Sequence, residues 1–409
     1  TSFLTLFAVQ AQEKKSIVVP NENLITENNA EIPKELANDV KKYSEFRIAS
    51  LVEVHPLKND IIINTRFGST SQLHRVSKSM GTRTQITFFD EPVSAASYEP
   101  IKGEYLVYSK DIGGNEFGQL FKLDLKTLQS TLLTDGGRSQ NGGIKWSKDG
   151  KGFYYSSTKR NGGDRDVYYM DPNNPKAEKL ILQVKGGGWG IQDISPDGKQ
   201  LVLGEYVSIN ESYLWLLDIA TGKLTEITDR SVKGVSQSNA NFSSIPNEIW
   251  FITDKDNEFE RLASMNLNTK KTTYYTSNIP WNIENFKLSN DKKSIVFISN
   301  EAGLNKMYLM NTATKAYKEV KNLPIGLISD PHFTKDNQTI FFNQSTAQSA
   351  SDVYQLNIQT GKINRWTESE LGEMQPSDMS VPKFIEWKSF DDLKISGFYY
   401  PASPNFTGK

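Results

Sequence analysis

The sequence predicts an all-β fold, a seven-bladed β-propeller made of four-stranded antiparallel blades. Two observations predict it. A turn motif between short apolar runs recurs seven times along the chain, and a second landmark downstream of each turn keeps nearly the same period. Units of about 40 to 50 residues with four strands each are typical of propeller blades. Because a single four-stranded sheet cannot cover both of its apolar faces, the units must stack around a common axis.

The turn motif is clearest at residues 195–199, which read Ser-Pro-Asp-Gly-Lys between apolar runs. Proline presets one turn dihedral and glycine supplies a left-handed residue, so the flanking runs are expected to form a hairpin. Ser195 looks like a nucleophile in isolation, but the repeat indicates a role in the turn. Equivalent turns occur at residues 55–59, 99–103, 147–150, 244–247, 289–292 and 334–337.

The second landmark is an Asp or Asn that ends the third strand of units two to seven. These residues lie 45 to 48 positions apart, at Asp124, Asp171, Asp218, Asn266, Asn311 and Asn357. A turn and a more polar fourth strand follow, most clearly at residues 221–228 and 360–367. We therefore assign residues 48–370 to the propeller. Strand counting shows no strand exchanged between the two ends, so how the ring closes stays open.

The segment before the propeller has two parts. Residues 1–15 contain a short apolar run followed by small and charged residues, and we interpret them as the remnant of a signal peptide, with a frayed apolar terminus as the alternative. Residues 16–47 form an N-terminal extension. Ile32, Leu36, Val40 and Tyr43 recur at helical spacing, which predicts a helix over 32–43 with Pro33 in its first turn. We expect this helix to dock on the sheet body, and the protein to be periplasmic or secreted.

Residues 371–409 do not continue the repeat. They contain an aromatic strand at 384–390, a turn at 391–392 and a second strand at 393–401. Alone, such a hairpin exposes apolar surface and unpaired edges. We expect it to be a linker that begins the sheet of a following domain.

Composition excludes several classes of function. The 47 Lys and Arg nearly balance the 48 Asp and Glu, and no segment is basic enough for a nucleic-acid interface. The chain has no cysteine, which removes disulfides, a thiol nucleophile and a cysteine-based zinc site. After residue 15 no apolar run approaches the roughly 20 residues of a membrane span. We predict no cofactor and no metal.

The blade turns together with the junction at 381–401 resemble the prolyl oligopeptidase family of serine peptidases, and best its acylaminoacyl-peptidase and dipeptidyl-peptidase-like branch. The resemblance implies a propeller that caps a C-terminal α/β-hydrolase domain carrying a Ser-His-Asp triad. This sequence contains no G-x-S-x-G elbow. It follows that 371–409 is the start of a truncated hydrolase domain, that no catalytic residue lies in this chain, and that the fragment alone is inactive.

Charged residues of two neighbouring blades are candidates for binding substrate. They are Arg160, Arg165 and Asp166 of blade three, and Glu205, Asn210 and Glu211 of blade four. The resemblance places this rim toward the hydrolase domain. There the arginines would hold a peptide carboxylate or carbonyl, and the glutamates a free amine. The alternative is a solvated loop or salt bridges between domains.

Three other features carry a structural interpretation. His55, His74 and His332 are expected to pack in turns or strands. Residues 254–258 have the alternating oxygen ligands of a calcium loop, but lack its glycine and its final glutamate, and are interpreted as a hairpin loop. The glycine-rich run 186–190 lacks the phosphate-loop pattern and is expected to connect two blades.

The leading hypothesis is a substrate-gating propeller of an exported serine peptidase that hydrolyses short peptides. Its partners would be the peptide and the α/β-hydrolase domain of the same polypeptide. The alternative is a stand-alone periplasmic propeller that acts as a binding or scaffold module. The reading frame after Lys409 distinguishes the two, because only the peptidase requires a G-x-S-x-G elbow there.

Overall fold

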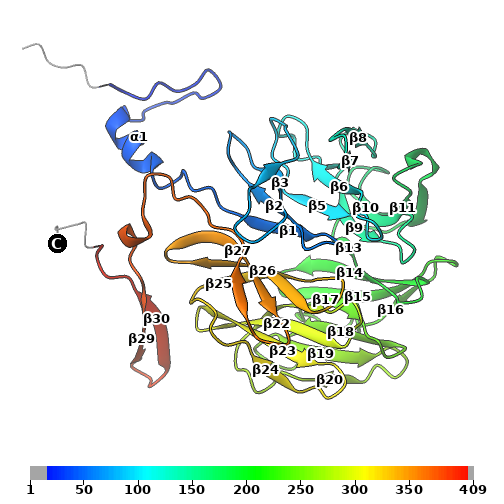
Figure 1. Ribbon diagram of the computed structural model, residues 1–409. Coiled ribbons are helices and arrows are strands. Elements are labelled where there is room, and N and C mark those ends of the chain that lie inside the picture. The colour runs from blue at the N-terminus through cyan, green and yellow to red at the C-terminus, as the bar shows by residue number, and fades with distance from the viewer. Residues whose placement is uncertain (1–15, 404–409) are drawn as a thin grey trace, which may run out of the picture.

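The computed structural model describes residues 16–403, so the predicted signal-peptide remnant at 1–15 lies outside the described residues. Seven antiparallel sheets of four strands follow one another along the chain and form a propeller (Figure 1). In every sheet the strands lie in sequence order, each paired with its neighbour in the chain. The predicted all-β, seven-bladed fold is confirmed.

Each blade contributes four consecutive strands. Blades one to three consist of β1 (Ser50–Val54), β2 (Ile61–Thr65), β3 (Gln72–Val76) and β4 (Thr84–Gln85); β5 (Ala95–Tyr98), β6 (Tyr105–Lys110), β7 (Gln119–Asp124) and β8 (Ser130–Leu132); and β9 (Asn141–Trp146), β10 (Phe153–Ser157), β11 (Asp166–Met170) and β12 (Lys179–Leu182). Blades four and five consist of β13 (Trp189–Ile194), β14 (Gln200–Ser208), β15 (Glu211–Asp218) and β16 (Leu224–Glu226); and β17 (Gln237–Phe242), β18 (Glu248–Thr253), β19 (Arg261–Asn266) and β20 (Thr272–Tyr274). Blades six and seven consist of β21 (Ile283–Leu288), β22 (Ser294–Glu301), β23 (Leu304–Asn311) and β24 (Tyr317–Glu319); and β25 (Leu327–Phe333), β26 (Thr339–Thr346), β27 (Ser349–Asn357) and β28 (Ile363–Arg365).

The recurrent turns join the first and second strands of each blade, as predicted. Ser195 is a turn residue: its hydroxyl accepts hydrogen bonds from the N–H groups of Lys199 and Gln200, at 3.1 and 2.9 Å, and donates one to Asp197 at 2.6 Å. Six of the seven turns place one residue in the left-handed region, with φ between 57° and 72°. These residues are Gly103, Gly150, Gly198, Asn247, Lys292 and Asn337.

The Asp or Asn at the end of the third strand in blades two to seven stabilises the next turn through its side chain. Asp218 Oδ1 accepts hydrogen bonds from the N–H and the hydroxyl of Thr221, at 2.9 and 2.7 Å. This local bonding is typical of an Asx turn, and it explains why the landmark recurs once per blade. The same pairing with a threonine three positions later occurs at Asp124, Asn266, Asn311 and Asn357.

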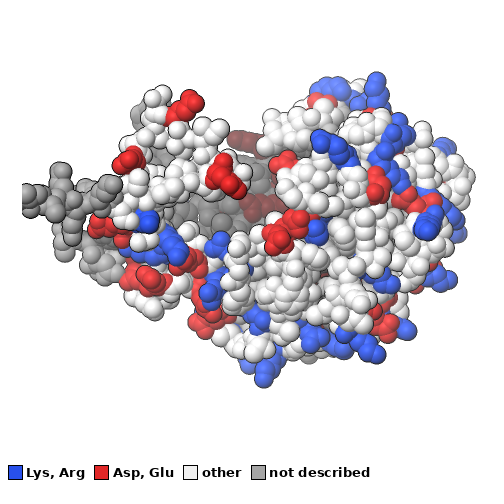
Figure 2. All heavy atoms as spheres, turned by 90° about the horizontal axis from the view of Figure 1, so that it is seen from above, with Lys and Arg blue, Asp and Glu red and all other residues white. Residues whose placement is uncertain are grey.

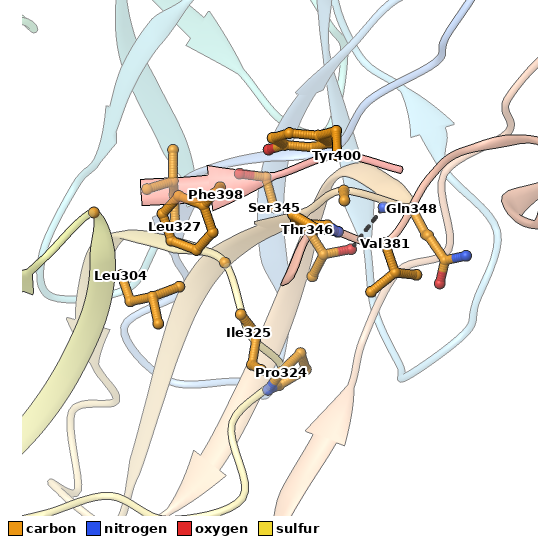
Figure 3. Close-up of a pocket in the computed structure, with 14 residues that line it drawn as sticks. Leu304, Pro324, Ile325, Leu327, Ser345, Thr346, Gln348, Val381, Phe398 and Tyr400 are labelled. Atoms are coloured by element: carbon orange, nitrogen blue, oxygen red, sulfur yellow. Dashed lines mark hydrogen bonds between the residues drawn. The ribbon is translucent and has the colours of Figure 1, made fainter. Parts of the chain in front are cut away.

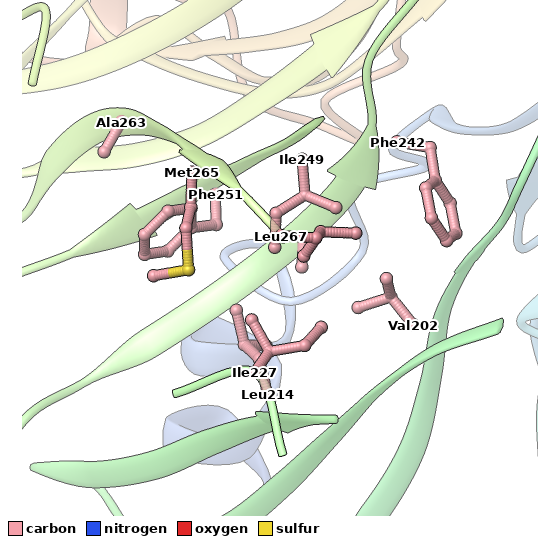
Figure 4. Close-up of a cluster of buried hydrophobic side chains, with 10 residues drawn as sticks. Val202, Leu214, Ile227, Phe242, Ile249, Phe251, Ala263, Met265 and Leu267 are labelled. Carbon is pink, nitrogen blue, oxygen red and sulfur yellow. The ribbon is translucent and has the colours of Figure 1, made fainter. Parts of the chain in front are cut away.

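The hydrophobic core is divided among the interfaces between adjacent blades. Figure 4 shows one such cluster, in which Val202 and Leu214 of blade four pack with Ile249 and Phe251 of blade five. All four side chains are buried. Each contributes about 2 kcal/mol relative to exposure, so the stability of one blade depends on its neighbours.

The ring closes by packing of blade seven on blade one, without an exchanged strand. Trp366 and Phe341 of blade seven stack edge to face, with ring centroids 4.9 Å apart, in a cluster that includes Leu51. Leu51 N–H donates to Asn343 Oδ1 at 2.8 Å, and Ala49 N–H to the Ser351 carbonyl at 3.1 Å. This answers the question of closure that the sequence left open.

The N-terminal helix differs from its prediction. Helix α1 (Lys34–Lys41) is shorter than the predicted 32–43, and Pro33 is its N-cap instead of a first-turn residue. The expectation that it docks on the sheet body is wrong, because Leu36 and Val40 are 54% and 58% exposed and the helix lies away from the blades (Figure 1). The surface beyond its C-terminus is largely polar, formed by residues such as Arg66 and Glu370, with Phe67 as an exposed apolar side chain.

The predicted hairpin after the last blade is formed by β29 (Lys383–Lys388) and β30 (Lys394–Tyr399), following a short 3₁₀ turn at Pro376–Asp378; a similar turn lies at Pro175–Ala177. It lies on the same side of the propeller as α1 (Figure 1). Its aromatic side chains are largely exposed, with Trp387 at 49% and Phe390 at 101%. Because α1 has eight residues and the described chain contains no longer helix, no described helix could cross a membrane.

We expect Trp366→Ala to lower the free energy of unfolding by about 3–5 kcal/mol, because it opens a cavity at the interface that closes the ring. Trp387→Ala is the matched control, since Trp387 is half exposed on the hairpin. It should cost less than about 1 kcal/mol. Urea denaturation of both variants measures the difference. Equal losses would show that closure does not depend on Trp366.

Candidate functional site

The candidate residues lie at the face formed by the turns between second and third strands, which we call the rim. The chain leaves the last blade at this face, and the turns of blades six and seven here contact the β29–β30 hairpin. Seen from above, basic and acidic side chains are interspersed over the visible surface without a large field of one sign (Figure 2).

Arg160 is bound by carboxylates of its own loop. Its Nε lies 2.6 Å from Asp166 Oδ2, and its Nη2 lies 2.9 Å from Asp164 Oδ2 and 2.9 Å from the Val184 carbonyl. The hydrogen bonds to Asp166 and then Asp164 raise the pKa of Arg160. Asp166 is completely buried. The pair therefore fixes the loop between β10 and β11.

Arg165 is placed differently from Arg160. Its Nη2 donates to Gln140 Oε1 at 2.8 Å, and no carboxylate among the described residues pairs with it. Its Nε is buried without a hydrogen-bond partner. Arg165 therefore keeps donor capacity that Arg160 has already used.

Each of the two glutamates of blade four contacts one residue of β15 and one residue that follows β16. Glu205 is 8% exposed, and its two oxygens accept from Arg230 Nη2 at 2.7 Å and Trp215 Nε1 at 3.0 Å. Glu211 Oε1 accepts from the Tyr213 hydroxyl at 2.5 Å, which lowers the pKa of Glu211, and lies 3.4 Å from Lys233 Nζ. Asn210 is exposed at the tip of the β14–β15 hairpin.

The glycine-rich run joins the two candidate hairpins, and the prediction that it connects two blades is confirmed. Gly186 accepts from Arg165 N–H at 3.0 Å and donates to Asp164 Oδ1 at 2.7 Å, and Gly188 accepts from Tyr206 N–H at 2.9 Å. A Cβ at Gly188 would lie 2.0 Å from the Tyr206 carbonyl oxygen, so the backbone approach requires glycine. Blades three and four are thus adjacent at the rim.

The structure does not pair the blade-three arginines with the blade-four glutamates. Instead it forms two separate groups, one around Arg160 and one in which Glu205 and Glu211 bind Arg230 and Lys233. The sequence prediction missed these last two residues. Their position directly after a fourth strand, at the end that returns to the rim, was the signal that could have found them.

An apolar pocket of about 580 Å³ lies between the rim of blades six and seven and the hairpin (Figure 3). Leu327 and Phe398 lie side by side in it, and Tyr400 and Val381 line its hairpin side. A Cβ at Gly303, whose φ is +88°, would lie 2.8 Å from Phe398 Cε2. The sequence could not predict this pocket, because its walls come from segments that only the folded chain brings together.

The remaining candidates have structural contacts. His55 Nδ1 accepts from Leu57 N–H at 3.0 Å, and His74 Nδ1 lies 3.1 Å from the Gln72 carbonyl. His332 Nδ1 lies 3.4 Å from Glu53 Oε1, a contact between blades seven and one that the sequence prediction missed.

Among residues 16–403, no group of three or more His, Asp or Glu side chains could hold a metal ion. Asp254, the first residue of the calcium-like segment, lies in the hairpin loop between β18 and β19. Its Oδ1 accepts a hydrogen bond from Ser236 N–H at 2.8 Å.

Comparison with protein families identifies the fold. The model described as "Prolyl oligopeptidase, N-terminal beta-propeller domain" matches residues 93–369, more than half of the chain. The chain belongs to the prolyl oligopeptidase family. The match to the prolyl oligopeptidase propeller begins in the segment before β5, so it does not include blade one. A comparison with curated proteins found no match.

Solved prolyl oligopeptidase structures share this fold. A structure from a study of two prolyl endopeptidases and their inter-domain dynamics aligns with a TM-score of 0.71 and 13% identity, over 89% of this chain and 56% of that one. Prolyl oligopeptidase B from Galerina marginata aligns with a TM-score of 0.69 and 14% identity, over 89% of this chain and 57% of that one. The same enzyme bound to a 25mer macrocyclization substrate gives 0.68 and 15%, over 88% and 57%. This chain thus spans little more than half the length of these structures.

We expect Asp166→Asn to lower the melting temperature by a few degrees, because it removes the charge that holds Arg160 and weakens the bond from Val184 N–H, 2.9 Å away. Arg165→Gln is the control in the same loop, and it should leave the melting temperature nearly unchanged. Thermal unfolding followed by circular dichroism makes the comparison. An unchanged melting temperature in Asp166→Asn would contradict a structural role for this pair.

Proposed function

We propose that this chain is the propeller part of an exported serine peptidase that hydrolyses short peptides. The observation that carries the proposal is the family match over 93–369. The relatives point to the substrate class, since one solved prolyl oligopeptidase is described as bound to a 25mer macrocyclization substrate. In this proposal the catalytic Ser-His-Asp triad belongs to an α/β-hydrolase domain of the same polypeptide.

The hairpin supports a domain partner at the rim. Phe390 and Leu393 are 101% and 60% exposed, and β29 and β30 pair only with each other among the described strands. Apolar surface and open strand edges of this kind are stabilised when another sheet covers them. We propose that the hydrolase domain covers the hairpin and closes the cavity above the rim. Passage past the propeller would then admit peptides and exclude folded proteins by size.

Rim residues with unused hydrogen-bonding capacity would contact the peptide. Arg165 and the exposed Asn210 have it, and the contacts of Glu211 with Tyr213 and Lys233 both use Oε1. Arg165 would hold a carboxylate or carbonyl of the peptide, and Glu211 a free amine. Export to the periplasm or the medium is part of the proposal, and rests on the sequence of residues 1–15.

The full reading frame tests the proposed activity. We expect it to encode a G-x-S-x-G elbow after the hairpin, and the full-length protein to cleave short peptides and to react with a serine-directed phosphonate. The same peptide sequence inside a folded protein should stay intact. A full-length protein without the elbow, without labelling and without peptide cleavage would support the alternative of a binding or scaffold propeller.

Substitutions in that full-length enzyme test the rim. We expect Arg165→Gln or Glu211→Gln to raise KM for short peptides about tenfold, because each removes one charge-assisted hydrogen bond. The matched control is Glu104→Gln, an exposed residue near the opposite face. Steady-state kinetics with peptides that have free or blocked termini assigns each residue to one end of the peptide. An unchanged KM in both variants would remove these residues from the substrate site.

A further inference from the structure

The innermost strands of the seven blades carry a ring of equivalent polar residues. Each stands opposite the middle residue of the apolar triplet on the neighbouring second strand, so the seven positions share one register. All seven are polar although their strand partners are apolar. They are Glu53, Ser97, Lys145, Asp193, Asn241, Lys287 and His332.

Contacts between blades show that this ring converges on the propeller axis. Ser97 Oγ lies 3.2 Å from Glu53 Oε2, and Trp146 Nε1 donates to Ser97 Oγ at 3.0 Å, which links blades one, two and three. Lys292 Nζ of blade six lies 3.6 Å from Asp193 Oδ2 of blade four. That pair spans blade five, which requires both residues to reach toward the axis.

Positive charge exceeds negative charge around the ring of inner-strand residues. Five lysines gather in or beside the ring: Lys145, Lys148, Lys287, Lys292 and Lys335. Of these, only Lys292 has a carboxylate within 4 Å among the described residues. The lysines come from blades three, six and seven, and within residues 16–403 four of them have no carboxylate at ion-pair distance.

The two carboxylates nearby are already engaged. Glu53 contacts Ser97 and His332 and accepts from Val54 N–H at 3.1 Å. Burial works to raise the pKa of Glu53, but the hydrogen bond and charge of His332, the hydrogen bond from Val54 N–H and the charge of Lys287 together outweigh it, so the pKa is lowered and Glu53 stays ionised. Asp193 accepts from Phe242 N–H at 2.9 Å as well as pairing with Lys292. Neither carboxylate neutralises Lys145.

The unfavourable electrostatic interactions in this group are largest at Lys145. Its side chain is half buried, and burial lowers its pKa to about 8. The charges of Lys287, Lys292 and Lys148 act in the same direction, and Asp193 opposes them. A desolvated cation among like charges is unfavourable unless a counter-charge is bound.

A cavity of about 210 Å³ lies beside the ring, and Lys335 is the member of the five lysines that lines it. Residues from blades one, two, three, six and seven line it, among them Trp146 and Asn290 as well as the carboxylate of Glu53. Since one water occupies about 30 Å³ of liquid, this volume accommodates a small anion together with bridging waters.

We propose that a small oxyanion, a phosphate or a carboxylate compound, binds on the propeller axis at the end opposite the rim, held by Lys145, Lys148 and Lys287. The site is separate from the candidate substrate site and does not rest on the proposed peptidase function. Lysine is suited to this task because its ammonium group interacts with oxyanions as a point charge without fixed geometry.

Titration of the purified chain with inorganic phosphate or citrate, at constant ionic strength set with chloride, tests the site. We expect either anion to raise the melting temperature in a saturable manner, and Lys145→Met to weaken binding at least tenfold. Whichever anion binds more tightly identifies the chemical class. Lys151→Met is the matched control, because Lys151 lies near Lys148 in the same turn region but its side chain is 79% exposed. No saturable effect beyond chloride, or equal binding by Lys145→Met, would overturn the proposal.

Proton uptake provides a second measurement that needs no variant. At pH 8 Lys145 is only partly protonated, and a bound anion raises its pKa, so binding must take up protons. Calorimetric titration with sulfate, which does not titrate near pH 8, in buffers of different ionisation enthalpy measures this uptake. Binding without proton uptake would contradict the role of Lys145.

The same lysine predicts a pH-dependent stability difference without any anion. Because its pKa falls from 10.5 to about 8 on folding, charged Lys145 destabilises the folded chain. Lys145→Met should therefore melt at a higher temperature than the unsubstituted chain below pH 8. The difference should shrink between pH 8 and 10.5, where the lysine becomes neutral in both states. A lower melting temperature for the variant at pH 7 would show that Lys145 is already neutralised within the protein.

Discussion

Everything in this molecule depends on one constraint: a four-stranded blade has two apolar faces and cannot cover either by itself. Each blade therefore packs on both neighbours, as Val202 and Leu214 do against Ile249 and Phe251. The last interface, between blades seven and one, has no exchanged strand and relies on side chains such as Trp366 and on a few hydrogen bonds. Closure is thus made of the same interactions as every other interface, and the ring behaves as a repeating structure with one non-covalent seam.

Packing of the faces leaves two places for polar residues, the axis and the turns. At the axis the inner strands bring Glu53, Asp193 and the lysines together although they are far apart in sequence. At the rim the hairpins bring together charges of neighbouring blades and an apolar pocket under the linker. The two ends of the ring consequently differ in chemistry, with excess positive charge at one and paired charges beside apolar surface at the other.

The sequence predicted those features whose cause is local. The turn at Ser195 and the Asx turn at Asp218 are specified by residues within five positions of each other. The repetition of these turns therefore predicted the blades correctly. It could not predict contacts whose partners lie in other blades, such as Glu205 with Arg230 at the rim. The prediction for the helix was wrong for a related reason: the spacing of Leu36 and Val40 describes an apolar face, but only the fold shows that both side chains stay exposed.

The pattern of pairing at the rim bears on which residues can meet a substrate. For Glu205 to bind a peptide amine it would have to give up Arg230 and Trp215 Nε1, and the buried carboxylate would gain little from exchanging one set of charge-assisted bonds for another. Asp166 is bound still more firmly, since it is fully buried against Arg160. Arg165 faces no such exchange. Its guanidinium has no carboxylate to release, so a peptide oxygen adds an interaction at the rim without removing one.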